Sequence, residues 1–140
     1  MSAEEMKCVM IVDPSMPVGI LANSTAVMGV TIGKLFPEVV GQAVVDQSGC
    51  RHQGIIEFPI PILRGDRTIL REIRARLYEP AFEKVTVVDF FDVAQGCKTY
   101  GEYIEKMKDV PETAIDYFGV TVFGNKKLVN KLTGSLPLLR

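Results

Sequence analysis

The chain of 140 residues contains no tryptophan, one histidine and only three cysteines. Cys8, Cys50 and Cys97 lie far apart and form no CxxC pair, and the single histidine is His52. This composition excludes a disulfide scaffold and a zinc site built from Cys and His. We therefore expect no metal site and no cofactor. Cys8 is expected to pack in the core and His52 to lie on the surface.

An excess of positive charge is also absent, because 16 Lys and Arg residues stand against 17 Asp and Glu residues. Proteins that bind nucleic acid through charge are usually basic. Four arginines on one predicted helix could form a basic stripe, but they spread around it: Arg67, Arg71, Arg74 and Arg76. Binding of tRNA is therefore possible but not favoured.

Neither a secretory signal nor a membrane span is expected. The N-terminus is acidic and has no basic region followed by an apolar one. Residues 14–33 carry no charge, but half of them are Pro, Gly, Ser, Thr or Asn, whereas spanning helices are mainly apolar. We predict a loop followed by a buried helix, in a cytoplasmic protein.

Strand and helix patterns alternate along the chain, which predicts a single α/β domain over residues 1–140. Apolar runs of strand type cover residues 7–12, 43–46, 55–63, 84–90 and 117–123. Helical spacing covers residues 18–36, 66–77, 99–108 and 126–132. Pro59 and Pro61 predict that their segment is an edge strand or merely extended.

Two predicted helices begin with recognisable caps. Asp66 is a cap for its helix, and Thr99 with Glu102 forms a capping box. The spacing of the second helix places Tyr100, Ile104 and Met107 inward.

The C-terminal segment carries the most specific motif. Residues 130–139 read Asn-Lys-Leu-Thr-Gly-Ser-Leu-Pro-Leu-Leu. This resembles the closing motif of type II peptidyl-tRNA hydrolases, Asp-Lys-Val-Thr-Gly-His-Leu-Lys-Leu-Leu. Nearly the whole chain resembles the domain of unknown function 2000 family, which is assigned to the peptidyl-tRNA hydrolase II-like superfamily. The matching segments are residues 19–23, 45–49, 59–63 and 124–140.

The resemblance implies a three-layer α/β/α sandwich around a mixed four- to five-stranded sheet, and a homodimer. The hydrolases carry Gly-Lys-x-Ala-Ala-Gln-x-x-His at their first helix, and residues 19–27 lack that Lys, Gln and His. Asn130 and Ser135 replace the Asp and His of the tail. Since function lies in the site rather than the fold, we expect a binding or regulatory domain for a small-molecule or phosphate-bearing ligand. The alternative is a hydrolase acting on peptidyl-tRNA or a related ester.

Polar residues near the ends of strands are the candidates for chemistry. Asp13 ends the first strand, where α/β sheets bind ligands, and Asn23 could reach the same rim. Alternatively, Asp13 makes an Asx turn and Asn23 bonds a neighbouring backbone group. Asp89 and Asp92 could serve as an acid–base pair, or one of them could cap a short helix. In a hydrolase, Asp13 or Asp89 would activate water.

Residues of the C-terminal helix are the remaining candidates. Thr133 would position the water in a hydrolase, or merely close the helix. Lys126 and Lys127 begin this helix, where they suggest a bound anion such as phosphate, or are simply solvated. Lys131 matches the hydrolase tail, so Asn23, Lys126 and Lys131 are the predicted ligand-binding residues. Cys97 beside Lys98 is a weak candidate nucleophile.

Overall fold

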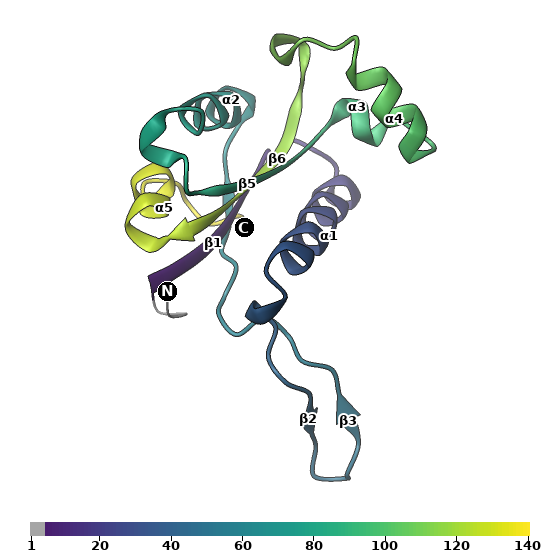
Figure 1. Ribbon diagram of the computed structural model, residues 1–140, viewed down its shortest axis with the longest axis vertical. Coiled ribbons are helices and arrows are strands. Elements are labelled where there is room, and N and C mark those ends of the chain that lie inside the picture. Colours follow the sequence, from purple (N-terminus) through teal and green to yellow (C-terminus); the bar gives the residue numbers. More distant parts are fainter. Residues whose placement is uncertain (1–4) are drawn as a thin grey trace.

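The computed structural model describes residues 5–140 and contains one four-stranded mixed sheet (Figure 1). The acidic start of the chain, on which the expectation about a signal rests, lies mostly outside these residues. The strands are β1 (Met6–Val12), β4 (Ile62–Arg64), β5 (Thr86–Phe91) and β6 (Tyr117–Asn125), in the order β4-β1-β6-β5. β4 runs parallel to β1, whereas β6 is antiparallel to both β1 and β5. The predicted mixed α/β sheet is confirmed.

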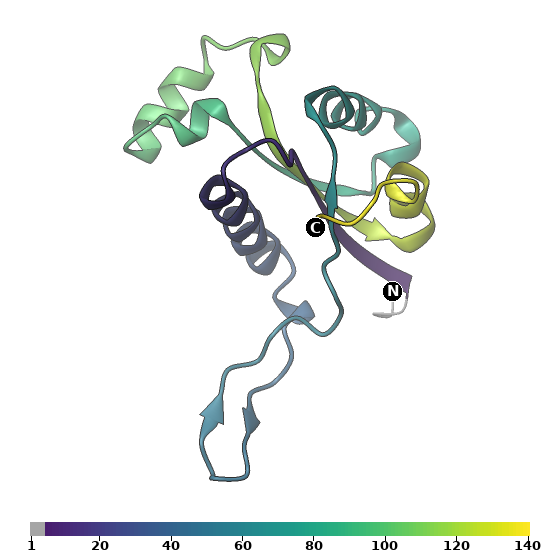
Figure 2. The ribbon, with the colours of Figure 1, turned by 180° about the vertical axis from the view of Figure 1, so that it is seen from behind.

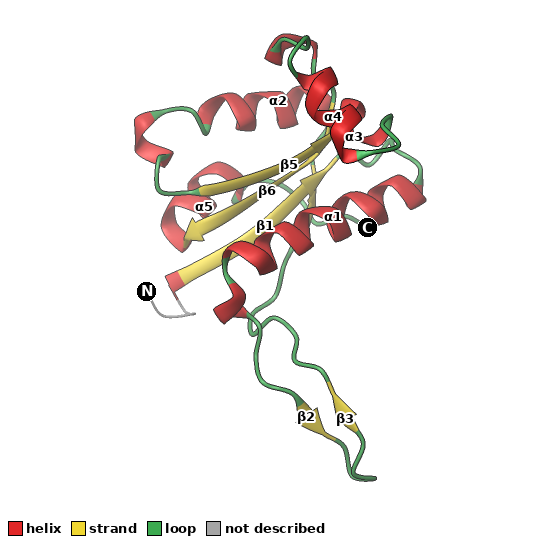
Figure 3. Cartoon of the chain, turned by 45° about the vertical axis from the view of Figure 1, so that its right-hand side comes forward, coloured by secondary structure: helices red, strands yellow, loops and turns green. Residues whose placement is uncertain are grey.

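Helices cover both faces of this sheet. α1 (Val18–Leu35) lies on one face, and α2 (Arg67–Arg76) and α5 (Lys126–Thr133) lie on the other (Figure 2). The short helices α3 (Asp92–Gln95) and α4 (Tyr100–Met107) follow β5 at the end of the sheet (Figure 3). Single 3-10 turns complete the connections: η2 (Pro37–Val39), η3 (Pro80–Phe82) and η4 (Glu112–Ala114).

Alternating side chains of β1 separate two cores. Val9 and Ile11 pack with Leu70 of α2 and Val129 of α5. The residues between them face α1, where Met10 and Val12 pack with Met28, and Cys8 packs with Ile32. A strand covered on both faces is apolar at every position, which is why this segment reads as a continuous apolar run.

The prediction that the uncharged helix is buried is wrong. α1 has 18 residues, but only Ser24, Met28 and Ile32 are buried, because the sheet covers one side and nothing in the described chain covers the other. By length and composition, α1 is the one helix of residues 5–140 that could cross a membrane, although here it packs on the sheet.

A two-stranded arm projects away from the domain, as Figure 1 shows. We use the term arm for residues 40–56, which contain β2 (Val44–Val45) and β3 (Arg51–His52) in antiparallel pairing. At its base, the N–H of Gly41 donates to the carbonyl of Ile55 at 2.9 Å. The turn uses Gly49 at φ 84°, a conformation that other residues adopt with difficulty. The strand and turn predicted here exist, but outside the main sheet.

The C-terminal tail docks on the outer edge of β4. The N–H of Arg64 donates to the carbonyl of Pro137 at 2.9 Å, and the N–H of Leu139 to the carbonyl of Ile62 at 2.8 Å. The tail therefore shields a short edge strand. The two prolines precede β4, in agreement with the prediction of an edge or extended segment.

Both predicted N-caps are confirmed, although the side chain of Glu102 accepts the N–H of Lys98, so the capping box is borne out only at Thr99. Asp66 Oδ1 accepts the N–H of Ile69 at 2.9 Å, and Thr99 Oγ1 accepts the N–H of Glu102 at 3.1 Å. The predicted inward face of α4 needs correction, because Tyr100 and Ile104 are exposed. Met107 packs inward as predicted, and Tyr103 packs inward in place of the other two. The helix lies beside the end of the sheet, so its position there decides which of its faces is buried, and helical spacing alone does not.

Candidate functional site

The register of the sheet separates the predicted site residues into two groups. Val12 pairs with Gly119 at one end of β1, and Met6 pairs with Asn125 at the other end. Asp13 is seven residues from Met6 and therefore lies about 23 Å from the level of the start of α5, at about 3.3 Å of rise per residue. The structure does not bring Asp13 together with Lys126.

Asp13 is a buried carboxylate whose acceptors are occupied. Its side chain is 4% exposed, and its Oδ1 accepts the N–H of Ser15 at 2.9 Å and the hydroxyl of Ser15 at 2.7 Å. Its Oδ2 lies 3.8 Å from Nε of Arg67. The Asx-turn interpretation is confirmed: this carboxylate shapes the loop after β1.

Three arginines of α2 share one face, which corrects the expectation that they spread around the helix. Arg67 lies 3.2 Å from Asp116, Arg71 lies 3.2 Å from Glu112, and Arg74 lies 2.9 Å from Asp89. The spacing of four and then three residues places them on successive turns. Arg76 packs over the ring of Phe82. The face is electrostatically balanced rather than basic.

Asp89 and Asp92 do not act as a pair. Asp89 binds Nε of Arg74, whereas Asp92 Oδ1 accepts the N–H of Asp116 at 3.0 Å. The prediction that one of them caps a helix is wrong, because the N-cap of α3 is Phe91 and has no side-chain bond. Asp116, the residue before β6, lies next to Asp92 only in the folded chain, so this backbone partner could not be predicted from the sequence.

The α5 candidates form no enclosed site. The hydroxyl of Thr133 is buried and donates to the carbonyl of Val129 at 2.8 Å. Lys126 and Lys131 are exposed. Asn125 Oδ1 accepts the N–H of Lys127 at 2.9 Å, so the start of the helix has an internal acceptor.

Asn23 is exposed on α1 and makes a contact that was not predicted. Its Nδ2 lies 3.5 Å from Oε1 of Gln95 in α3. This contact joins α1 to α3, whereas the side chain of Asp13 bonds to Ser15, so the bonds of these two predicted site residues do not converge.

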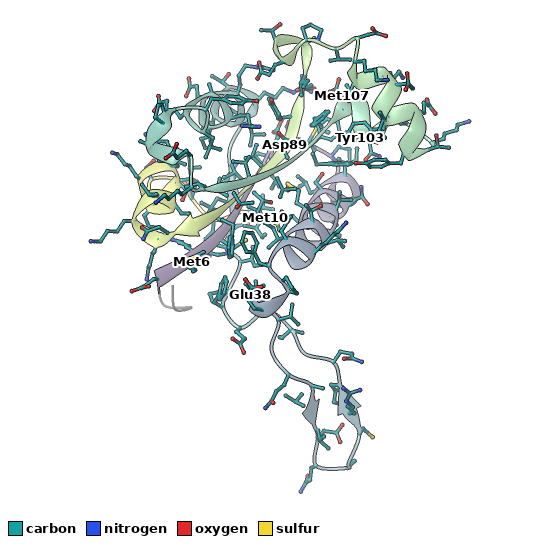
Figure 4. All side chains as sticks on the ribbon, in the orientation of Figure 1. Met6, Met10, Glu38, Asp89, Tyr103 and Met107 are labelled. Atoms are coloured by element: carbon teal, nitrogen blue, oxygen red, sulfur yellow. The ribbon has the colours of Figure 1, made fainter. Side chains whose placement is uncertain are left out.

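Beyond that contact, a cavity of about 380 Å³ lies between α1, β5 and the α3–α4 segment; we call it the α1–α4 cavity. This volume falls within the range typical of small-molecule sites. Figure 4 labels Asp89 on β5 and Tyr103 on α4, the two elements that bound it on one side. Its lining combines apolar and polar side chains: Val27, Thr31, Val88, Asp89, Phe90, Ala94, Cys97, Lys98, Thr99, Tyr100 and Tyr103.

Tyr103 is the most perturbed group of this cavity. Burial raises the pKa of its phenol, and the charges of Asp89, Tyr100 and Cys97 raise it further. The phenol therefore keeps its proton at neutral pH and can donate a hydrogen bond to a ligand. The Tyr100 ring packs edge-on against it at 5.5 Å.

Two other titratable groups are perturbed for structural reasons. Burial raises the pKa of the Cys8 thiol to about 12, which makes it inert and confirms its role in packing. Burial and Glu112 raise the pKa of Tyr117, whose hydroxyl donates to Glu112 at 3.1 Å.

Other cavities also combine apolar and polar groups, but none of those described here has a tyrosine hydroxyl beside a carboxylate. Glu38 and Glu57 line one of them, and another of about 490 Å³ lies in the arm beside His52. One of about 320 Å³ lies among Met6, Phe36 and Phe123 near the opposite end of the sheet, and one of about 340 Å³ lies between α1 and Leu139. Asp13 lines none of the cavities described here. Within residues 5–140, no group of three or more His, Cys, Asp and Glu residues is placed to bind a metal ion.

Sequence reasoning singled out Asp89 and Cys97 but did not place them in one cavity. It missed Tyr103, because the helical periodicity indicated Tyr100 as the inward residue. The capping box fixes the start of α4, and Tyr103 lies one residue after Glu102. Only the position of α4 beside β5 shows that this ring faces Asp89.

Comparison with solved structures supports the fold. The "Protein of Unknown Function Atu0240" from Agrobacterium tumefaciens strain C58 is similar with a TM-score of 0.85. The two chains are 19% identical, and the match covers 96% of this chain and 97% of the other. At this identity the likeness shows the fold alone. No curated protein matches the chain. A family model described as a protein of unknown function matches residues 6–140, so the chain belongs to the DUF2000 family.

Proposed function

We propose that this protein is a small-molecule-binding domain whose site is the α1–α4 cavity. The observation that carries the proposal is the convergence of Asp89, Cys97 and Tyr103 on one hollow with apolar walls. Ligand sites commonly combine such walls with a few polar groups that fix orientation.

The charges favour a neutral aromatic ligand over a phosphate-bearing one. Asp89 is the one carboxylate among the residues that line the cavity, and Lys98 contributes the one ammonium group. The lining therefore carries one group of each charge and gives an anion no excess of positive charge to bind. A planar neutral molecule can pack on Tyr100 and accept from Tyr103.

We further propose that the scaffold is of the peptidyl-tRNA hydrolase II-like kind and has lost the hydrolase chemistry. The tail motif supports the kinship, and in this chain the tail that carries the motif docks on β4. Asp13, Asp89 and Thr133 are bound to Ser15, Arg74 and the carbonyl of Val129, respectively. None of the three has the arrangement of a general base beside a water-positioning hydroxyl.

Ligand-observed NMR with a library of small neutral aromatic fragments tests the binding proposal. Ala94→Leu fills the cavity, and Ala81→Leu places the same side chain at an exposed position on η3. We expect fragments to bind the parent and Ala81→Leu but not Ala94→Leu. Absence of binding to the parent, or equal binding to both variants, would refute the site.

Turnover of a peptidyl-tRNA mimic tests the hydrolase alternative. We expect none from the purified protein. Turnover that is lost in Asp13→Asn, Asp89→Asn or Thr133→Ala would establish the hydrolase instead. A gel shift with tRNA is also expected to be negative, because α2 pairs its arginines with acids.

A further inference from the structure

The cavity of about 320 Å³ lies where the arm leaves the domain, at the end of the sheet where β1 begins; we call it the aromatic cavity. Three phenylalanines line it. Phe36 follows α1, Phe58 follows the arm, and Phe123 belongs to β6. The ring centroid of Phe123 lies 4.4 Å from that of Phe36 and 6.2 Å from that of Phe58. The three rings therefore form one continuous aromatic wall.

Two carboxylates line the same cavity. Glu38 lies in η2, and the N–H of Glu57 donates to the carbonyl of Val39 at 2.9 Å, so a backbone bond holds the two segments side by side. A Cβ added to Gly41 would lie 3.2 Å from Cγ and from Oε1 of Glu57, so this side chain lies against the base of the arm. Figure 4 labels Glu38 and Met6, which line the cavity from different segments.

Neither carboxylate has a cationic partner. In the part of the chain from residue 5 to residue 140, no ion pair or side-chain hydrogen bond involves Glu38 or Glu57. None of the residues that line the cavity is Lys, Arg or His. Two negative charges at one hollow with no positive charge among its walls produce a negative potential there, which attracts cations.

We infer that the aromatic cavity binds a small organic cation of the quaternary ammonium class, at a site separate from the α1–α4 cavity. The alkyl groups of the ligand pack on the phenylalanine rings and on Met6, and its charge lies near Glu38 and Glu57. Aromatic side chains attract ammonium groups through the quadrupole of the ring. A metal ion fits less well, because Ca²⁺ takes six to eight oxygen ligands and Mg²⁺ retains its waters, whereas most of this lining is apolar.

Methionine-methyl NMR of the full chain, with choline as the probe, tests the inference. Met6 lines the cavity, whereas Met107 packs at the opposite end of the domain (Figure 4). We expect millimolar choline to shift the methyl resonance of Met6 and to leave that of Met107 unchanged. The analogue of choline in which carbon replaces nitrogen has the same shape and no charge, and we expect it to bind about tenfold more weakly.

Two substitutions separate the contribution of charge from that of shape. Glu38→Gln and Glu57→Gln keep the size of the side chain and remove its charge, and each is expected to weaken choline binding about two- to fivefold. The combined variant is expected to lose measurable binding. Glu83→Gln removes the same charge after η3, outside the cavity, and is the matched control, expected to bind like the parent.

Three results would overturn the inference. The first is a Met6 methyl resonance that does not respond to choline, and the second is equal affinity for choline and its neutral analogue. The third is binding by the combined variant that equals binding by Glu83→Gln. A shift of the Met6 resonance by calcium chloride that exceeds the shift by choline would overturn it in favour of a metal site.

Discussion

The two faces of the sheet are covered by helices to different degrees. On one face, α2 and α5 cover the strands, and the arginines of α2 are paired with acids. On the other face, α1 and the segments around Val39 and Phe58 cover the strands, but only three of the 18 side chains of α1 are buried, and α1 borders the α1–α4 cavity. Both faces bury apolar side chains, but the second also leaves apolar side chains of α1 exposed.

The largest expected effect is a loss of stability on the face of the sheet that α2 and α5 cover. Leu70→Ala removes a fully buried side chain from α2 and is expected to lower the free energy of unfolding by about 2–5 kcal/mol. Val30→Ala on the outer side of α1 should change it by less than about 0.5 kcal/mol in the monomer. Urea denaturation of both variants measures the contrast. Similar losses would show that the two faces do not differ in this way.

The ion pair between Arg74 and Asp89 should have an intermediate effect. Arg74→Met leaves a half-buried carboxylate without its partner, which we expect to cost about 1.5–3 kcal/mol. Asp89→Asn combined with Arg74→Met should cost less than the two single changes added, since each single change leaves a lone charge and the double variant leaves none. Strict additivity in urea denaturation would contradict the coupling.

Alkaline pH should weaken the α1 face through Cys8. Its pKa is 9.0 when unfolded and about 12 when folded. Stability is therefore unaffected below pH 9 and falls as pH rises from 9 toward 12, because only the unfolded thiol ionises. The fall should be smaller in Cys8→Ala, where the raised pKa values of Tyr103 and Tyr117 still lower stability above about pH 10. Ellman's reagent should modify Cys50 quickly and Cys8 only on unfolding, since Cys50 is exposed.

The smallest expected effect is a response of the arm to acid pH. A hydrogen bond from His52 to Asp46 at 2.8 Å, followed by the backbone N–H of Cys50, lowers the pKa of that carboxyl from 3.8. The contribution is present above about pH 4 and is lost as pH falls through the lowered pKa. Amide shifts of the arm should move in acid while those of β1 stay constant. A simultaneous change in β1 would tie the arm to the core.

Local patterns were sufficient for much of the fold. The Asp66 and Thr99 caps depend on residues within one turn, so they could be predicted and are confirmed. The prediction that Tyr100 and Ile104 point inward from α4 was wrong, and so was the prediction of an Asp cap for α3. Each depends on contacts with a segment that is distant in sequence. Asp92 finds its partner at Asp116, which lies 24 residues further along the chain.

The order of apolar and polar residues determines the strands, helices, turns and the absence of a Cys/His metal centre, because these follow from short-range backbone preferences and composition. The docking of elements decides the rest. It pairs three arginines with acids, leaves the outer side of α1 bare and brings Tyr103 to Asp89. Contacts of this kind join residues that lie far apart in the sequence, so no local sequence pattern predicts them.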